Sequence, residues 1–293
     1  PNVIFIMVDD LGYSDLSSFG NEEFSTPEID KFIGQGLKFT NAYAAAPYCS
    51  PTRVALMTGK YPAKFSIGLR EPLTLSKKDL VLGLSPSIPT LTSLLKENDY
   101  ETALFGKWHL GQKVEYLPSK HGVDHFFGIM CGAADHIDHK PFDRNGDLLF
   151  KKDIPNLYEN NQQVTKNGYL NNLITDYSIE FIKKKHDKPF FLSIQFTAPH
   201  WPWQGPSDLP VDSISYSQSS NKKVYQAMVK NLDENFGKVM KALKSKGLEE
   251  STLVIFTNDN GGAKFANQGN LKGLKGSLNE GGIRVPAAVR WPK

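Results

Sequence analysis

The segment PYCSPTR, residues 47–53, places one of the chain's two cysteines beside a pattern that is typical of a helix start. Ser50 followed by Pro51 predicts a helix with Ser50 as its N-cap and Pro51 at the first helical position. Cys49 would then lie just outside a helix N-terminus, where backbone N–H groups favour negative charge, and Arg53 adds a cation one turn further on. The pattern indicates an activated nucleophile or an anion site, and its alternative is a small apolar residue packed beneath a loop.

Two apolar runs of the sequence are each followed by a pair of residues with oxygen ligands. The pairs are Asp9 with Asp10, and Asp259 with Asn260. Carboxylate and amide oxygens favour Ca²⁺ or Mg²⁺ over Zn²⁺. Either pair alone is ordinary turn chemistry at the end of a strand. Taken together, the two pairs predict a metal site.

Cations and imidazoles occupy three further motifs. Lys107 and His109 in GKWHLG stand two residues apart, so an extended chain would place both on one side. His200 lies between two prolines in APHWPW, and Lys272 and Lys275 lie among the glycines of LKGLKGSLNEGG, where the backbone could approach an anion. A surface lysine, a packing histidine and a flexible basic loop are the respective alternatives.

The segment 121–140 contains four histidines and three aspartates, but their spacing matches no closed zinc site. We interpret Asp135 and His136, together with His139, as residues that line a substrate pocket.

The elements that must hold these residues alternate between strand and helix patterns. Strand patterns occur at 2–8, 100–105, 189–197 and 252–257, and helix patterns at 26–36, 90–98, 169–185 and 222–247. Such alternation predicts an α/β fold with a mainly parallel central sheet and helices on both faces. Ligands of such sheets bind beyond the carboxyl ends of the strands, so the motifs should converge at one edge. Segments 61–89 and 112–168 are too long for plain connections, and we expect them to cover the site.

Composition excludes several classes of protein. A hydrophobic fraction of 40% and a charged fraction of 22% are ordinary for a soluble globular protein with a core. The net charge of +3 gives no reason to expect a nucleic-acid partner, and two cysteines cannot form a disulfide framework. No apolar run approaches the length of a membrane span. The chain ends within a strand-like run, IRVPAAVRWPK, so we expect a further C-terminal portion.

Five motifs, taken in order, make the chain resemble the sulfatase family, of arylsulfatase type, within the alkaline-phosphatase-like superfamily. They are DD after the first strand, CSPTR with MTG following, GKWHLG, NDNGG and KGSLNEGGIRVP, and together they extend from residue 2 to the end of the chain. The resemblance implies one catalytic domain over 1–293, with 112–168 as an insertion that covers the pocket. It also implies that the small C-terminal subdomain of the family is missing from this chain.

The resemblance assigns a role to each candidate residue. It implies that a formylglycine-generating enzyme converts Cys49 to Cα-formylglycine, whose hydrated aldehyde is the nucleophile. It implies that Ca²⁺, with Mg²⁺ as the alternative, is held by Asp9, Asp10, Asp259, Asn260 and the residue at position 49. It further implies that Arg53 and His109 stabilise the formylglycine, that Lys107 and Lys275 bind the sulfate, and that His200 protonates the leaving alcohol. Lys275 is the better match than Lys272, because it directly precedes GSLNEGG.

The expected activity is hydrolysis of a sulfate monoester on a carbohydrate or an aryl group, with Trp201, Trp203 and residues 112–168 contacting the ring. One alternative keeps the nucleophile and transfers phosphorus, as a phosphonate or phosphodiester hydrolase. The other is a catalytically silent, calcium-stabilised binding module, which the presence of every core residue disfavours.

Tyr48 departs from the smaller residue that the family usually carries there. We expect such a protein to be periplasmic or secreted, without a membrane span.

Overall fold

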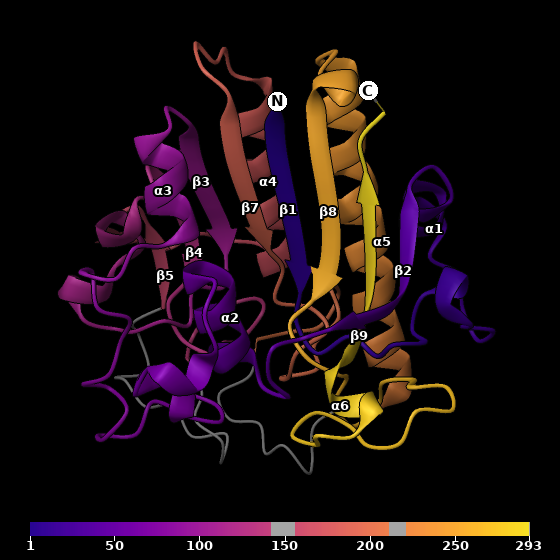
Figure 1. Ribbon diagram of the computed structural model, residues 1–293. Helices are drawn as coiled ribbons and strands as arrows, with labels where there is room; N and C mark the ends of the chain where they lie inside the picture. Colours follow the sequence, from indigo (N-terminus) through magenta and orange to yellow (C-terminus); the bar gives the residue numbers. More distant parts are fainter. Residues whose placement is uncertain (142–155, 211–220, 293) are drawn as a thin grey trace.

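The computed structural model describes residues 1–141, 156–210 and 221–292. Within these residues one nine-stranded sheet has the order β2-β9-β8-β1-β7-β3-β4-β5-β6 (Figure 1). The strands are β1 (Asn2–Val8), β2 (Leu37–Tyr43), β3 (Glu101–Gly106), β4 (His125–Ile129), β5 (Leu157–Glu159), β6 (Gln162–Gln163), β7 (Phe190–Gln195), β8 (Thr252–Asn258) and β9 (Arg284–Arg290).

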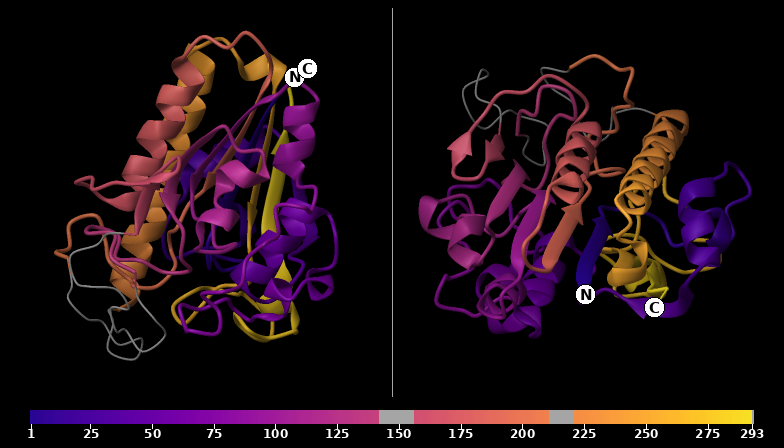
Figure 2. Two further views of the ribbon diagram at one scale, coloured as in Figure 1. Left: turned by 90° about the vertical axis from the view of Figure 1, so that its left-hand side faces the viewer. Right: turned by 90° about the horizontal axis from the view of Figure 1, so that it is seen from above.

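Helices cover both faces of this sheet. They are α1 (Pro27–Gly34), α2 (Cys49–Thr58), α3 (Leu91–Glu97), α4 (Leu170–Lys183), α5 (Lys222–Ser245) and α6 (Glu280–Ile283). Figure 2 shows the long helices α4 and α5 on one face, and α2 and α3 on the opposite face. In the part of the chain that the structure describes, no helix combines the length and apolar character that crossing a membrane requires.

The five central strands of the sheet, β8, β1, β7, β3 and β4, run parallel to one another. Antiparallel strands are confined to the two sides, β9 and β2 on one and β5 and β6 on the other. The predicted mainly parallel sheet with helices on both faces is therefore confirmed. The sequence patterns missed β2, an edge strand whose residues are mostly exposed and so lack the alternation of a half-buried strand.

The hydrophobic core lies between the central strands and the helices. β7 is buried at every position, and so are the α5 side chains Met228, Leu232, Phe236 and Val239. Full burial of each such side chain contributes about 1.5–3 kcal/mol. A platform packed on both faces in this way keeps its strand ends fixed relative to one another.

The start of α2 differs from the prediction. Cys49 is the first residue of α2 and Tyr48 is the N-cap, so the prediction that Ser50 caps the helix is wrong. The Ser50 hydroxyl accepts instead from the backbone N–H of Leu73 at 2.7 Å, which ties the following loop to the first turn of the helix. Cys49 still lies at a helix N-terminus, because the helix begins only two residues earlier than predicted.

The end of β3 permits only glycine. Gly106 has φ of +122°, and a Cβ there would lie 1.8 Å from the backbone oxygen of Gln195 on β7. We expect Gly106→Ala to lower the free energy of unfolding by about 3 kcal/mol or more, because a backbone collision adds to the backbone strain. Urea unfolding measures this change.

The matched control is Gly59→Ala, at a glycine with φ of +64° and open space around it. That substitution should cost about 1–2 kcal/mol, the strain of a left-handed residue alone. Equal losses in the two variants would contradict the close approach of β3 and β7.

Candidate active site

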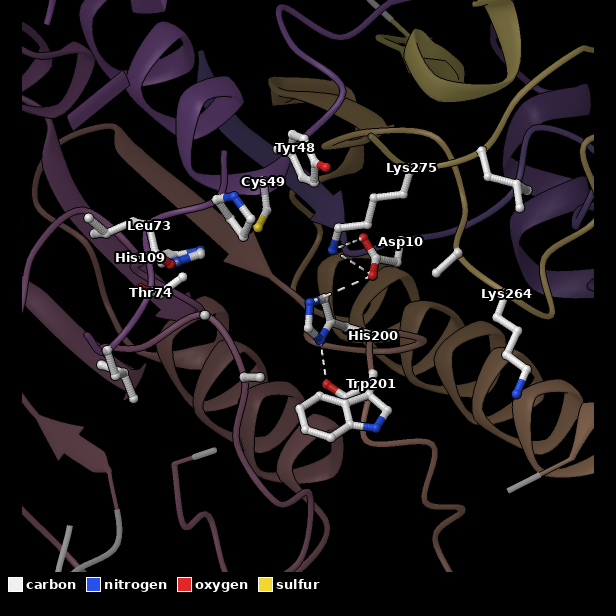
Figure 3. Close-up of a pocket in the computed structure, with 16 residues that line it drawn as sticks. Asp10, Tyr48, Cys49, Leu73, Thr74, His109, His200, Trp201, Lys264 and Lys275 are labelled. Atoms are coloured by element: carbon white, nitrogen blue, oxygen red, sulfur yellow. Dashed lines mark hydrogen bonds and ion pairs between the residues drawn. The ribbon is translucent and has the colours of Figure 1, made fainter. Parts of the chain in front are cut away.

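The carboxyl ends of four parallel strands bring the predicted residues together at one edge of the sheet. Asp9 and Asp10 follow β1, Lys107 and His109 follow β3, His200 lies beyond β7, and Asp259 and Asn260 follow β8. A pocket of about 610 Å³ opens at this edge, and its lining includes Asp10, Cys49, His109, His200, Trp201 and Lys275 (Figure 3). The predicted convergence of the motifs is thus observed.

Three buried carboxylates form the centre of the site. Ligand oxygens of Asp9, Asp10 and Asp259 all lie within 4.8 Å of one another. The side-chain nitrogen of Asn260 donates to Asp10 at 2.7 Å. The side-chain oxygen of Asn260 and one carboxylate oxygen of Asp9 have no hydrogen-bond partner among the described residues. Buried oxygens that lack donors are what a cation requires, so this donor set fits a Ca²⁺ or Mg²⁺ ion.

The carboxylates affect one another's pKa. Burial and the nearby Asp9 hold the pKa of Asp259 well above its usual range. Burial opposes ionisation of Asp9 too, but Lys107 and then His200 and Arg53 outweigh it and lower the pKa of Asp9. Lys107 donates to Asp9 at 2.5 Å, so the Asp9 carboxylate is the better compensated of the two. Carboxylates held this close together repel one another when ionised, which favours a divalent cation at the cluster.

Arg53 lies one turn into α2 and spreads its guanidinium across three elements. It donates to Asp259 at 2.9 Å, to the side-chain oxygen of Gln195 at 2.9 Å and to the backbone oxygen of Lys107 at 3.0 Å. Sequence reasoning missed Gln195, although a glutamine in the apolar run FFLSIQF was a visible signal. The guanidinium of Arg53 therefore links three strand ends in addition to supplying a positive charge.

Cys49 faces this cluster from the helix N-terminus. Its sulfur lies within 4.8 Å of a carboxylate oxygen of Asp9 and a ring nitrogen of His200. Lys275 donates to Asp10 at 2.6 Å, and His200 Nε2 lies 3.6 Å from the same carboxylate (Figure 3). A group at position 49 is therefore within reach of cations, carboxylates and an imidazole together.

The two site histidines differ in which ring nitrogen carries the proton. His109 Nε2 lies 2.8 Å from the backbone oxygen of Leu73, a group that only accepts, so Nε2 is the donor. Burial and then Lys107 lower the pKa of His109, so the ring is neutral and Nδ1 holds a free lone pair. His200 Nδ1 donates to the backbone oxygen of Trp201, which turns Nε2 toward Asp10. Burial and then Lys275 lower the pKa of His200 to about 3.

Two predicted substrate contacts are not supported by the geometry. Asp135 and His136 are both buried and do not line the pocket. Asp135 accepts from the backbone of Ile137 and from Gln204, and His136 Nε2 contacts the backbone oxygen of His200. Their side chains bind protein groups behind the pocket, which was not apparent from a sequence rich in His and Asp.

The walls of the pocket come mainly from loops. They include Tyr48, Pro72, Leu73, Thr74, Leu75, Gly132, Ala133, Ala263, Lys264 and Leu274. Residues 72–75 and 132–133 of these walls belong to segments 61–89 and 112–168. That 112–168 is an insertion that covers the pocket stays a prediction, and residues 142–155 lie outside the described residues. Most of these lining residues were not identified from the sequence, because small and apolar residues carry no chemical signal.

Asp15 joins the loop of Asp9 and Asp10 to two distant segments. Its carboxylate accepts from the backbone N–H of Gly12 at 2.6 Å, from that of Asn267 at 3.1 Å, and from the hydroxyl of Tyr225 on α5. Burial raises the pKa of Asp15 to about 6, and the bond from Tyr225 partly offsets that rise. Asp15 therefore fixes the loop of Asp9 and Asp10 against the rest of the edge.

Comparison with known proteins agrees with the motifs. A family model described as Sulfatase matches residues 1–293. The chain belongs to the sulfatase family. It is similar to N-acetylgalactosamine-6-sulfatase of Mus musculus, with 31% identity over 310 residues that cover 100% of this chain and 57% of that protein. It is also similar to Arylsulfatase J of Mus musculus, with 34% identity over 299 residues, or 100% and 48% respectively.

Solved structures of sulfatases share the fold. The structure of Ps i-CgsB in complex with k-i-k-neocarrahexaose matches with a TM-score of 0.83 and 34% identity, covering 100% of this chain and 66% of that chain. PsFucS1 sulfatase from Pseudoalteromonas sp. matches with a TM-score of 0.72 and 25% identity, covering 99% and 62%. The alkaline-phosphatase-like fold is thereby confirmed. This sulfatase chain spans about half the length of the curated relatives described above.

The bond between Tyr225 and Asp15 predicts a pH-dependent change in stability. Folded Asp15 keeps its proton up to about pH 6 and unfolded Asp15 only up to about 4, so its favourable contribution is lost as pH rises through 6. Tyr225→Phe removes a donor that favours the carboxylate. We expect a loss of about 2 kcal/mol in the free energy of unfolding at pH 8, and less than about 1 kcal/mol at pH 5.

Urea unfolding at the two pH values tests this expectation. The matched control places Tyr225→Phe in an Asp15→Asn background, where the loss should no longer depend on pH. Equal losses at pH 5 and pH 8 in the native background would show that Asp15 does not titrate in this range.

Proposed function

We propose that this chain forms the catalytic unit of an enzyme that hydrolyses a sulfate monoester. The observation that supports it most is the position of Cys49, at a helix N-terminus among three carboxylates and the cations Arg53, Lys107 and Lys275. Membership of the sulfatase family points to the same chemistry. An anionic ester needs such a concentration of positive charge, because its own charge repels an incoming nucleophile.

Two groups would complete the site. Asp9, Asp10, Asp259 and Asn260 would hold Ca²⁺, with Mg²⁺ as the alternative, and Cys49 would carry Cα-formylglycine made by a formylglycine-generating enzyme. When bound, the cation supplies positive charge beside position 49, and the hydrated aldehyde supplies a nucleophilic hydroxyl that a thiol lacks. The donor set fits the first group, and the buried, charge-surrounded side chain of Cys49 fits the second.

Three cations of this chain bind and orient the sulfate. Lys107 and Lys275 carry ammonium groups at the carboxylates, where they can donate to sulfate oxygens. Arg53 is held by Gln195 and Asp259, so its guanidinium keeps one orientation while the ester binds. Fixed donors of this kind stabilise charge that develops on the sulfuryl oxygens without having to reorganise.

The two histidines handle protons. His200 presents Nε2 to the pocket, and the negative charge of a bound ester favours its protonated form, so it can protonate the departing alcohol oxygen. His109 presents the lone pair of Nδ1, because its proton is on Nε2, which donates to the backbone oxygen of Leu73. One ring thus serves as a donor and the other as an acceptor.

The ester class that we propose is a sulfated carbohydrate or an aryl sulfate. Trp201 lines the pocket and offers an aromatic ring for stacking, and Tyr48 borders Cys49 on the other side. The similar structure of Ps i-CgsB contains k-i-k-neocarrahexaose, which supports a carbohydrate. Location in the periplasm or outside the cell stays a prediction.

Removal of calcium should destabilise the protein and abolish hydrolysis. A ligand at 1,000 times its Kd stabilises the folded state by about 4 kcal/mol, so EGTA should lower the Tm by several degrees and excess Ca²⁺ should restore it. Differential scanning calorimetry measures the shift, and release of 4-nitrophenol from 4-nitrophenyl sulfate measures activity.

Two aspartate variants control the calcium experiment. Asp259→Asn removes charge from the donor set and should make the Tm insensitive to Ca²⁺. Asp124→Asn breaks a surface ion pair with Lys96 and should leave the calcium response intact. A native protein whose Tm and activity are the same in EGTA and in Ca²⁺ would refute the metal assignment.

The choice of sulfur over phosphorus tests the proposed function itself. We expect kcat/KM for 4-nitrophenyl sulfate to exceed that for bis(4-nitrophenyl) phosphate by about 100-fold or more, because the pocket would be matched to the sulfuryl transition state. Cys49→Ala, the control, should lose both activities. The mass of the tryptic peptide 39–53 reports whether position 49 carries a thiol or an aldehyde.

Each contrary outcome has a defined meaning. A strong preference for the phosphodiester would make the protein a phosphorus-transferring relative with the same nucleophile. An intact thiol in protein made with the converting enzyme, together with no hydrolysis of either ester, would leave a calcium-stabilised binding module.

A further inference from the structure

The segment 197–204, which carries His200, is held from behind by polar side chains that the proposed mechanism does not use. They come from two places, the loop that follows β4 and the first turns of α4. All of them are buried, and they do not line the pocket. Their hydrogen bonds converge on the backbone of this one segment.

His136 holds the His200 end of the segment. Its Nε2 lies 3.2 Å from the backbone oxygen of His200, which only accepts, so Nε2 carries the proton. The ring is 1% exposed and stacks on Tyr169 with centroids 5.5 Å apart. Its backbone N–H donates to Gln204 at 3.0 Å, so His136 contacts the segment on both sides of Trp201.

Asn171 holds the other end. Its side-chain oxygen accepts from the backbone N–H of Thr197 at 3.1 Å, from the Thr197 hydroxyl at 3.1 Å and from the backbone N–H of Ala198 at 3.4 Å. Asn171 is fully buried on α4, a helix packed against the sheet. The turn between β7 and His200 is therefore fixed to a rigid element.

These anchors determine where the ring of His200 lies. Among the described residues the ring bonds to the adjacent Trp201 carbonyl and approaches Asp10 at 3.6 Å, so its position follows that of its own backbone (Figure 3). We propose that His136 and Asn171 are positioning residues for His200, and that they set the alignment of its Nε2 with the leaving oxygen of the ester. This inference rests on the proposed function, in which His200 is the proton donor.

Misplacing His200 should affect alkyl sulfates and aryl sulfates to different extents. A leaving group as acidic as 4-nitrophenol needs little protonation, whereas an alkyl alcohol needs a well-placed acid, and general acid catalysis contributes about 10²–10⁴-fold. Misplacement of a catalytic group by about 1 Å can cost 10²-fold. Loss of either anchor should therefore reduce turnover of an alkyl sulfate far more than that of 4-nitrophenyl sulfate. A merely structural role would reduce both equally.

The test compares His136→Leu with His136→Gln, which keeps an N–H donor of similar reach, and Asn171→Leu with Asn171→Asp, which keeps the acceptor. For both leucine variants we expect kcat/KM for cyclohexyl sulfate to fall about 30-fold or more, and that for 4-nitrophenyl sulfate by less than about 3-fold. The conservative variants should stay within about 3-fold of the native enzyme for both esters. Using two anchor positions keeps the test valid if one variant fails to fold.

His200→Ala provides the reference. It should show the same split between the two esters, and adding His136→Leu to it should cause little further loss, because residues acting through one group are not additive. If His200→Ala shows no split, His200 is not the proton donor and that part of the proposed function fails.

A second readout is independent of activity. Long-range ¹H–¹⁵N spectra of the folded protein report the tautomer of His200, which we expect to be a single Nδ1–H form in the native protein and mixed or exchange-broadened in the leucine variants. An unchanged His200 signal in both leucine variants would overturn the positioning role, whatever the activities. Equal losses on the two esters would overturn it as well.

Discussion

Mutual compensation of buried charge is the constraint on which the rest of this structure depends. Three carboxylates occupy one small space, and each is matched by a cation: Asp9 by Lys107, Asp10 by Lys275 and Asp259 by Arg53. Burying a single unpaired charge costs several kcal/mol, so neither set could remain in a water-poor site without the other. The same arrangement would suit the divalent cation and the anionic ester of the proposed function, whose charges would enter as a pair.

The parallel sheet makes such compensation possible, because it delivers residues that are far apart in the sequence to one edge. Arg53 and Asp259 are separated by 206 positions and meet at 2.9 Å. Close approach of β3 and β7 at Gly106 keeps Lys107 and His109 in register with the other strand ends. Asp10 and His109 both have positive φ, of 65° and 57°, so some backbone strain lies at the candidate site.

Much of the fold and of the site could be predicted from local patterns. Continuous apolar runs identified four of the five central strands, β1, β3, β7 and β8, but not the short β4. The polar residues directly after those four strands identified the candidate site, because both features lie within a few residues of each other. Features that depend on distant partners could not be found in this way. Gln195 matters through Arg53, Asp15 through Tyr225, and the Ser50 hydroxyl binds Leu73 instead of capping its own helix. Asp135 and His136 are residue types that often occur in binding sites. Their hydrogen bonds to Gln204 and to the backbone of His200 place them behind the pocket, and the local sequence does not show these contacts.

The site thus has two layers with different physical tasks. The inner layer consists of charged residues, most of which directly follow a strand. Both properties can be read from short motifs, so the family is recognisable even where sequence identity is about 31%. The outer layer consists of neutral donors and acceptors such as Asn171, His136 and Gln195, which hold backbone and side chains of the inner layer. Charge alone would attract a sulfate ester into the pocket. The proton transfer of the proposed function requires in addition a fixed geometry, which in our proposal comes from the outer layer.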